Sequence, residues 1–504
     1  MKVTFNFDNE ATVERSWRDD WRTWAWLAAL GAAAVVLRVI AMGSTLPDHD
    51  AVNFALGLDR FDLEAHRPHF PGYPVFLALA WPLRAIGLSP AVALALPAVA
   101  LSAVTVAATG AALLRYGRAS ALLGAALVAT LPGLCVADAT PLSDGLGAQL
   151  VALGAAALFA GASGAGTTGA PIWGRLPWAR LAVVAFALLP GIRASSVLIA
   201  AVGLALTLAG ANRRERLVRV GLAAAVAAAW LAPLVALAGG PAALIDIGAR
   251  FTRGHFEAWG GTALAAGAPG ATERLTLLAH NLFTVLLGPA AAATLGVLLA
   301  ASRPGRRWTF TLLALALPYA AWVAIGQNPE KPRHLLPLLP LLVLGAAPAT
   351  ARVGSRLRPA LALAPIAIAA VTLPHLVEAS RPSPAAQAGA WLAARPPEQL
   401  QVYAGEETGV LRFNAPAHRS VLVRDAADVL RDVTDRGNVP RTILVTSGVR
   451  GAASLPGRLV ERARFERSPL VDPHAPFLVV WEWRPNTSLA DAGILATNAK
   501  EISQ

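Results

Sequence analysis

The stretch WARLAVVAFALLPGIRASSVLIAAVGLALTLAG, from Trp178 to Gly210, decides how the rest of the chain is interpreted. It is apolar almost throughout and about 33 residues long, whereas roughly 20 residues suffice for one helix to cross a bilayer. The pair Pro190-Gly191 interrupts it near the middle, and both residues favour a break in a helix. We therefore predict two short spans, over 176–191 and 193–210.

Apolar runs of similar length recur along the first three quarters of the chain. Hydrophobic residues make up 55% of the sequence and charged residues 15%, against about 25% charged in soluble proteins, which excludes an ordinary water-soluble globule. Together the runs predict a membrane all-α fold with about eleven transmembrane helices, while 73–88 is a short helix at the interface. The other spans are expected at 22–42, 92–114, 119–137, 145–162, 218–238, 276–300, 308–326, 335–350 and 359–376.

The distribution of arginine supports this count. The net charge is +12, and with the N-terminus inside the arginine clusters fall in the loops predicted to be cytoplasmic. A single span over 178–210 would place every later loop on the opposite side of the membrane, with the arginine clusters outside. The cations are scattered between apolar runs, which excludes a nucleic-acid-binding face, and the single cysteine, Cys135, excludes an intrachain disulfide. The polar segment 1–21 and the run after it predict an uncleaved signal anchor.

The composition changes after about residue 377. Residues 377–504 carry nearly equal numbers of basic and acidic side chains, unlike the helical part. Short β-rich runs around a helix at 425–435 predict a small α/β domain, which span parity places outside the cytoplasm. The predicted strands are Leu400–Ala404, Ser420–Val423, Thr442–Thr446 and Pro476–Trp483.

The first outer loop, over 43–91, is the richest in groups that can perform chemistry. Between Pro47 and Pro74 it contains four aspartates, a glutamate, three histidines and two arginines. The pair Asp48 and Asp50 precedes a short amphipathic helix that we expect to lie on the membrane. The alternative is a solvated loop in which an aspartate only caps that helix.

Three motifs resemble those of one enzyme family. The stretch from Asp50 through His66-Arg-Pro-His-Phe-Pro-Gly-Tyr-Pro74 is similar to the first outer loop of bacterial GT-C-type glycosyltransferases, in the superfamily of protein O-mannosyltransferases and aminoarabinose transferases, family 39. Gly191-Ile-Arg-Ala-Ser-Ser196 resembles a turn between two middle helices of that family. Lys331-Pro-Arg-His-Leu-Leu-Pro-Leu-Leu-Pro340 resembles the start of a late helix.

The resemblance implies a polytopic GT-C helical bundle and a catalytic aspartate just after the first span. The implied donor is a polyprenyl-phosphate sugar, the other partners are membrane lipids and an unknown acceptor, and the location is the bacterial cytoplasmic (inner) membrane with the site facing outward. The family often has Asp-Glu or Glu-Asp where this chain has Asp48-His49-Asp50, so either aspartate can be the catalytic one. We expect Asp50 to be the general base with Asp48 as its partner, and we expect inversion at the anomeric carbon.

Cations are needed where the phosphate departs, and arginine is well suited because it donates two hydrogen bonds at once. We expect Arg193, Lys331 and Arg333 to bind it, with Arg67 and His69 as further candidates. Arg193 lies at the break between two spans, where a charge is costly and usually functional. The alternatives are snorkelling for Arg193 and headgroup anchoring for Lys331 and Arg333.

Four further residues are expected to contact the acceptor or the sugar: Asp138, Asp144, His255 and Trp259. For Asp144 the alternative is a helix cap, and for Trp259 it is a marker of the membrane interface. We expect no cofactor, although Asp48, His49 and Asp50 could instead bind a divalent metal through oxygen and nitrogen ligands. The competing function is that of a multi-span transporter or lipid-linked-sugar flippase, but no internal repeat of the kind typical of transporters is visible.

Overall fold

The computed structural model describes residues 21–161, 177–265, 267–353, 358–436 and 442–485. The chain divides into two compact units. One consists of Met1–Met42 and Phe54–Ser380, and the other of Gly43–Asn53 and Arg381–Gln504. We call them the helical unit and the α/β unit, and describe each by itself.

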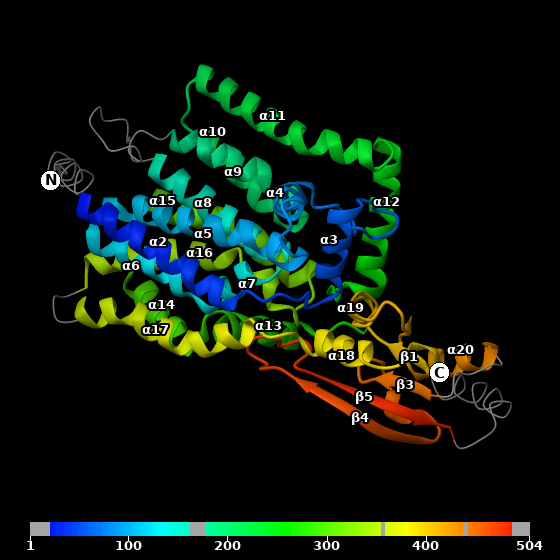
Figure 1. Cartoon of the computed structure of the whole chain (residues 1–504). Coiled ribbons are helices and arrows are strands. Elements are labelled where there is room, and N and C mark those ends of the chain that lie inside the picture. The colour runs from blue at the N-terminus through cyan, green and yellow to red at the C-terminus, as the bar shows by residue number, and fades with distance from the viewer. Residues whose placement is uncertain (1–20, 162–176, 266, 354–357, 437–441, 486–504) are drawn as a thin grey trace, which may run out of the picture. The chain divides into compact units, whose positions relative to one another are not determined.

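Helices form nearly all of the regular structure up to residue 380 (Figure 1). They are α2 (Trp21–Ala41), α3 (His49–Asp59), α4 (Pro74–Ala85), α5 (Pro90–Leu113), α6 (Arg118–Thr130), α7 (Pro132–Ala139), α8 (Ser143–Gly161), α9 (Trp178–Ile192), α10 (Val197–Leu208), α11 (Arg213–Leu237), α12 (Pro241–Gly254), α13 (Ala271–His280), α14 (Gly288–Ala301), α15 (Arg306–Gly326), α16 (Leu338–Ala346) and α17 (Arg358–Ala379). Short turns of helix at Ala194–Ser196, His255–Trp259, Asn281–Leu286 and Pro332–Leu335 connect some of them.

Six helices in the described part of the chain are long and apolar enough to cross a membrane, or eight if each of two bent pairs is one span. The six are α2, α5, α8, α11, α15 and the run Pro359–Ala393, which includes α17. The sequence predicts about eleven. Four apolar runs correspond to apolar helices below spanning length, which are α4, α9, α10 and the region of α16. These runs are the predicted interface helix at 73–88 and the predicted spans at 176–191, 193–210 and 335–350. The chain is thus a multi-pass membrane protein with several short helices.

The stretch 178–210 forms two helices, and small residues let these pack closely on their neighbour α8. The first helix, α9, ends at Ile192, directly after Pro190-Gly191, and α10 starts at Val197. Phe186 of α9 is fully buried between Gly154 of α8 and Gly203 of α10, where any added methyl group would meet its ring. Glycine therefore sets the close approach of these helices, as is common between helices in membranes.

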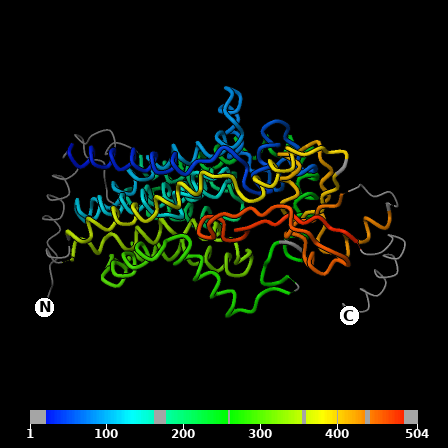
Figure 2. The backbone as a smooth tube through the Cα atoms, turned by 60° about the horizontal axis from the view of Figure 1, so that its bottom comes forward, coloured from blue at the N-terminus to red at the C-terminus, as the bar shows by residue number. Residues whose placement is uncertain are grey.

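Helix α17 packs against two helices from the start of the helical unit, α2 and α6. In both views α17 runs alongside α2 and α6 (Figure 2).

Helices α7 and α8 form a tight hairpin. An added Cβ at Gly145 would lie 2.5 Å from the carbonyl oxygen of Ala137, so only glycine allows this close approach. This hairpin brings two acidic residues, Asp138 and Asp144, onto adjacent helices.

The α/β unit contains a five-stranded mixed sheet with the order β2-β1-β3-β5-β4. Strands β1 and β2 are parallel, as are β1 and β3, whereas β3 pairs with β5 and β5 with β4 in antiparallel fashion. The strands are β1 (Leu400–Ala404), β2 (Arg419–Leu422), β3 (Thr442–Thr446), β4 (Arg458–Glu466) and β5 (Phe477–Arg484). Its helices are α18 (Pro384–Ala393), α19 (Thr408–Asn414) and α20 (Ala426–Arg436).

Alternate residues of the central strands point to opposite faces of this sheet, and each face has its own core. Tyr403 packs with α20 on one face, whereas Val402 and Ala404 pack with α18 and α19 on the other. Both faces of the central strands are therefore covered by helices, as is usual for parallel strands.

Candidate active site

The strongest candidate site surrounds Arg193, which lies where α9 ends. Its Nη1 is 2.7 Å from Oδ1 of Asp144, in the first turn of α8, and its Nη2 is 2.8 Å from Nδ1 of His334. Only 9% of Arg193 and 4% of Asp144 are exposed. A buried charge of this kind is costly unless it is paired, so the two partners fix both the charge and the orientation of the guanidinium.

The local sequence places Arg193 at this point. Pro190-Gly191 ends α9, and Arg193 itself has an extended backbone. Glycine is needed at 191 because a Cβ there would lie 2.5 Å from Cγ2 of Val75. The Nε atom of Arg193 is buried and has no hydrogen-bond partner among the described residues. The N–H group at Nε thus remains as a donor for a ligand.

His334 must be neutral to accept the hydrogen bond from Arg193. Burial lowers the pKa of His334 well below its usual range, and the charges of Arg193, Arg333 and Lys331 lower it further. The carbonyl of His334 accepts a hydrogen bond of 2.8 Å from the hydroxyl of Tyr319 in α15. The imidazole is therefore held as a fixed acceptor and does not add a further cation.

Lys331 and Arg333, on the turn that leads to α16, complete a positively charged cluster. Both are half-buried, and both act electrostatically on His334, while Arg333 also acts on Arg193. Three cations thus lie close enough to act on one another or on His334, and Asp144 pairs with one of them, Arg193. Such a surplus of buried and half-buried positive charge suits a phosphate or another anion.

Aromatic side chains from the first loop lie beside this cluster. Nε2 of His69 and the hydroxyl of Tyr73 are 2.9 Å apart, and Phe54 packs against both rings. Tyr73 caps the start of α4 and is close enough to Arg193 to interact with its charge. The His69-to-Tyr73 turn therefore joins the first loop to the Arg193 cluster.

The remaining expected residues of the helical unit have other surroundings. The side chain of Arg67 is exposed, and its backbone pairs with Asp62 in both directions. Nε2 of His255 is 2.9 Å from the carbonyl oxygen of Gly326, and His255 acts electrostatically on His334. The side chain of Trp259 lies outside the described part of the structure.

Asp48 and Asp50 belong to the α/β unit. Oδ1 of Asp48 accepts a hydrogen bond of 2.9 Å from the backbone of Ala51, so Asp48 caps α3, and Asp50 lies in the first turn of that helix. Across the described residues, no three His, Cys, Asp or Glu side chains are arranged as ligands for a metal ion, at Asp48-His49-Asp50 or elsewhere.

Two solved structures illustrate what this architecture is similar to. ArnT from Cupriavidus metallidurans bound to undecaprenyl phosphate matches with a TM-score of 0.59 and 14% identity, over 91% of this chain and 98% of that chain. The apo oligosaccharyltransferase of Archaeoglobus fulgidus matches with a TM-score of 0.53 and 15% identity, over 86% of this chain and 70% of that chain. The chain has the GT-C fold. No family model and no curated protein sequence matches it.

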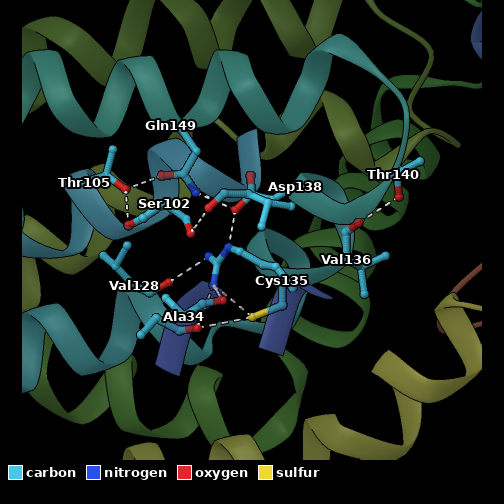
Figure 3. A network of polar contacts seen from close by, with 12 residues as sticks. Ala34, Ser102, Thr105, Val128, Cys135, Val136, Asp138, Thr140 and Gln149 are labelled. Atoms are coloured by element: carbon cyan, nitrogen blue, oxygen red, sulfur yellow. Dashed lines mark hydrogen bonds and ion pairs between the residues drawn. The ribbon is translucent and has the colours of Figure 1, made fainter. Parts of the chain in front are cut away.

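One polar network of the GT-C bundle was not expected from the sequence. Nε of Arg38, in α2, is 2.6 Å from Oδ2 of Asp138, in α7, and both side chains are fully buried. The same carboxylate oxygen accepts a hydrogen bond of 2.5 Å from Gln149, which in turn accepts one from Thr105. Figure 3 shows Asp138, Gln149 and Thr105 directed toward one another. Arg38 also donates to backbone carbonyls of Ala34, Ala129 and Val128.

This network neutralises Asp138 and fixes the α7–α8 hairpin that carries Asp144. His334 and Tyr319 are the other contributors that sequence reasoning did not assign. Of Arg38, His334 and Tyr319, the first two were indicated by the sequence. Arg38 is a charged residue within a predicted span, and His334 lies inside the Lys331–Pro340 motif.

Proposed function

We propose that this chain is a glycosyltransferase that moves a sugar from a polyprenyl-phosphate donor to an acceptor hydroxyl, with inversion at the anomeric carbon. The acceptor oxygen loses its proton to a carboxylate and bonds to the anomeric carbon. The bond between that carbon and the phosphate oxygen breaks, and polyprenyl phosphate leaves. The single observation that carries the proposal is the buried Arg193 cluster within a GT-C fold.

The cluster supplies what the leaving phosphate requires. Negative charge grows on the phosphate as the glycosidic bond breaks, and donors already held in place stabilise that charge best. Arg193 is held in this way by Asp144 and His334, and its Nε has no protein partner among the described residues. We assign phosphate binding to Arg193, Lys331 and Arg333, with His69 and Arg67 as supporting residues.

A first-loop aspartate is the proposed base. We assign proton abstraction to Asp50, in the first turn of α3, and a supporting role to Asp48, which caps that helix through its hydrogen bond with Ala51. Asp144 acts through Arg193, while His255 and Trp259 are the proposed wall for the sugar or acceptor. We place the reaction at the outer face of the bacterial cytoplasmic membrane, with about eleven spans, the N-terminus inside and the α/β unit outside.

The deciding experiment uses purified full-length protein in nanodiscs with radiolabelled undecaprenyl-phosphate sugars and a panel of hydroxyl acceptors. We expect release of undecaprenyl phosphate coupled to transfer, and a loss of at least a hundredfold in Asp50→Asn and Arg193→Ala. Asp435→Asn, at an exposed position of α20, is the control. Full activity in both Asp48→Asn and Asp50→Asn would remove the base assignment. Donor movement across the bilayer without bond cleavage would favour the flippase.

Orientation has its own test. A reporter enzyme fused after residue 377 should be active only on the outer side of the membrane. A cytoplasmic signal would overturn both the predicted parity of the spans and the outward location of the α/β unit.

A further inference from the structure

The segment Gly43–Asn53, which carries Asp48 and Asp50, is part of the α/β unit although more than 300 residues separate it from the rest of that unit. One attachment is made by Ser383 at the start of α18. Its hydroxyl donates to the carbonyl of Pro47 at 2.9 Å, and the same oxygen accepts from the backbone of Ala386 as the cap of α18. The start of α18 and the residue before Asp48 are therefore held by one side chain.

The second attachment lies at the carboxyl ends of the parallel strands β1 and β3. Glu407 follows β1, and its carboxylate accepts hydrogen bonds from the backbone of Gly405 at 3.2 Å and from the hydroxyl of Thr446 at the end of β3. Gly448 follows β3 and packs so closely that any added Cβ would overlap the Glu407 carboxylate. Glu407 thereby joins the two strand ends and fixes the start of α19.

His49 lies directly against this rigid edge. It packs on Gly409, the second residue of α19, and a Cβ at 409 would overlap Nδ1 of the imidazole. His49 is the residue between the two aspartates, at the start of α3. Any displacement of its ring therefore acts on the backbone that carries Asp48 and Asp50.

In open α/β sheets the crevice beyond the carboxyl ends of the parallel strands is the usual place for a ligand. In this chain the first-loop segment lies at that edge. We propose that the α/β unit positions the catalytic carboxylates of Asp48 and Asp50, and that Gly409 and Ser383 are its positioning residues. This inference rests on the proposed function, and it assigns the domain a part in the chemical step rather than in binding the donor.

The test compares Gly409→Ala with Gly221→Ala in purified full-length protein. Both glycines lie within helices, α19 and α11, where alanine is more favourable than glycine. The new methyl group meets His49 at position 409, whereas at position 221 no atom of the described residues lies within 4 Å of it. We expect Gly409→Ala to lower kcat about tenfold to a hundredfold, because small misplacements of catalytic groups are costly. The KM for the donor, the affinity for undecaprenyl phosphate and the melting temperature should change little, and Gly221→Ala should retain the wild-type kcat.

A second comparison separates positioning from general damage. In a His49→Ala background the ring that meets the new methyl group is absent, so adding Gly409→Ala should then cause no further loss of kcat. Ser383→Ala should lower kcat in the same way, and Ser383→Thr, which keeps the hydroxyl, should restore most of it.

The outcomes distinguish the two proposals. Wild-type protein that transfers no sugar from any donor would refute the proposed function. Active wild-type protein with an unchanged kcat in Gly409→Ala would refute positioning alone. An equal loss in the presence and absence of the His49 ring, or a loss confined to donor affinity, would also overturn it.

Discussion

Arg193 and Asp144 form an ion pair with 2.7 Å between Nη1 and Oδ1, inside the helical unit and almost out of contact with solvent. Asp144 lies in the first turn of α8, and Arg193 at the break after α9. The pair therefore connects a helix hairpin to an interrupted span. His334 completes the arrangement by accepting from the other terminal nitrogen of the guanidinium.

The first prediction concerns replacement of Arg193 by lysine. An ammonium group is a single point of charge and lacks the planar fork that reaches Asp144 and His334 together. We expect Arg193→Lys to bind undecaprenyl phosphate more weakly and to lose about a hundredfold or more in the rate of transfer. Titration of purified protein with undecaprenyl phosphate, followed by tryptophan fluorescence, measures the first effect. Wild-type rates in Arg193→Lys would show that charge alone is sufficient there.

The second prediction concerns the pH dependence of stability at His334. Because the pKa of the folded group lies well below 6.5, the unfolded chain binds the proton more readily. The stability contributed by neutral His334 is thus present above pH 6.5 and falls, as pH decreases toward the folded pKa, by up to about 1.4 kcal/mol per pH unit.

His334→Asn removes this titration and keeps an acceptor near the position of Nδ1. The difference in unfolding temperature between pH 7.5 and pH 5.5 should therefore be smaller in His334→Asn than in the wild type. Equal shifts in the two proteins would indicate that His334 is protonated as readily in the folded state as in the unfolded chain.

The third prediction concerns the buried pair of Arg38 and Asp138. Removing one partner leaves an uncompensated charge, so Asp138→Ala should destabilise the protein by about 3–5 kcal/mol. Arg38→Met combined with Asp138→Ala removes both charges and should recover much of that loss. Reversible unfolding in mixed micelles is measured for the wild type, both single variants and the double variant, and strictly additive effects would contradict a direct interaction.

The fourth prediction concerns Asp472 in the α/β unit. Burial raises the pKa of Asp472, Arg467 lowers it, and the charge of Asp48 raises it again. Electrostatic interaction is reciprocal, so ionised Asp472 also opposes ionisation of Asp48, the proposed partner of the base. Asp472→Asn should therefore move the acid limb of the pH–rate profile to lower pH. Asp435→Asn, on the exposed face of α20, should leave the limb where it is in the wild type.

Much of the architecture could be predicted from local sequence signals. The break after Pro190-Gly191, the short helix after Tyr73 and four of the five sheet strands follow from proline, glycine and β-branched residues. Strand β4 was missed because RLVERARFE alternates charged and apolar residues on an exposed edge, a pattern that resembles a solvated surface. Its antiparallel pairing with β5 supplies the hydrogen bonds that make it a strand.

The candidate site was less accessible to sequence reasoning, because its geometry depends on distant contacts. The cations were identifiable from their places in outer loops, but nothing near Arg193 in the sequence indicates Asp144 or His334 as partners. The assignment of Gly43–Asn53 to the α/β unit depends on contacts with residues such as Ser383 and Gly409. Such pairings depend on the complete fold and leave no local pattern.

The place of Gly43–Asn53 in the α/β unit also affects the order in which the protein can fold during synthesis. A ribosome makes this segment more than 300 residues before Ser383 and Gly409, and at about 5–20 residues per second the interval is on the order of tens of seconds. During synthesis the carboxylates emerge without the strand ends against which they finally lie. Synthesis of the helices up to α17 therefore precedes assembly of this contact, and the nascent protein lacks it until Gly409 has been translated.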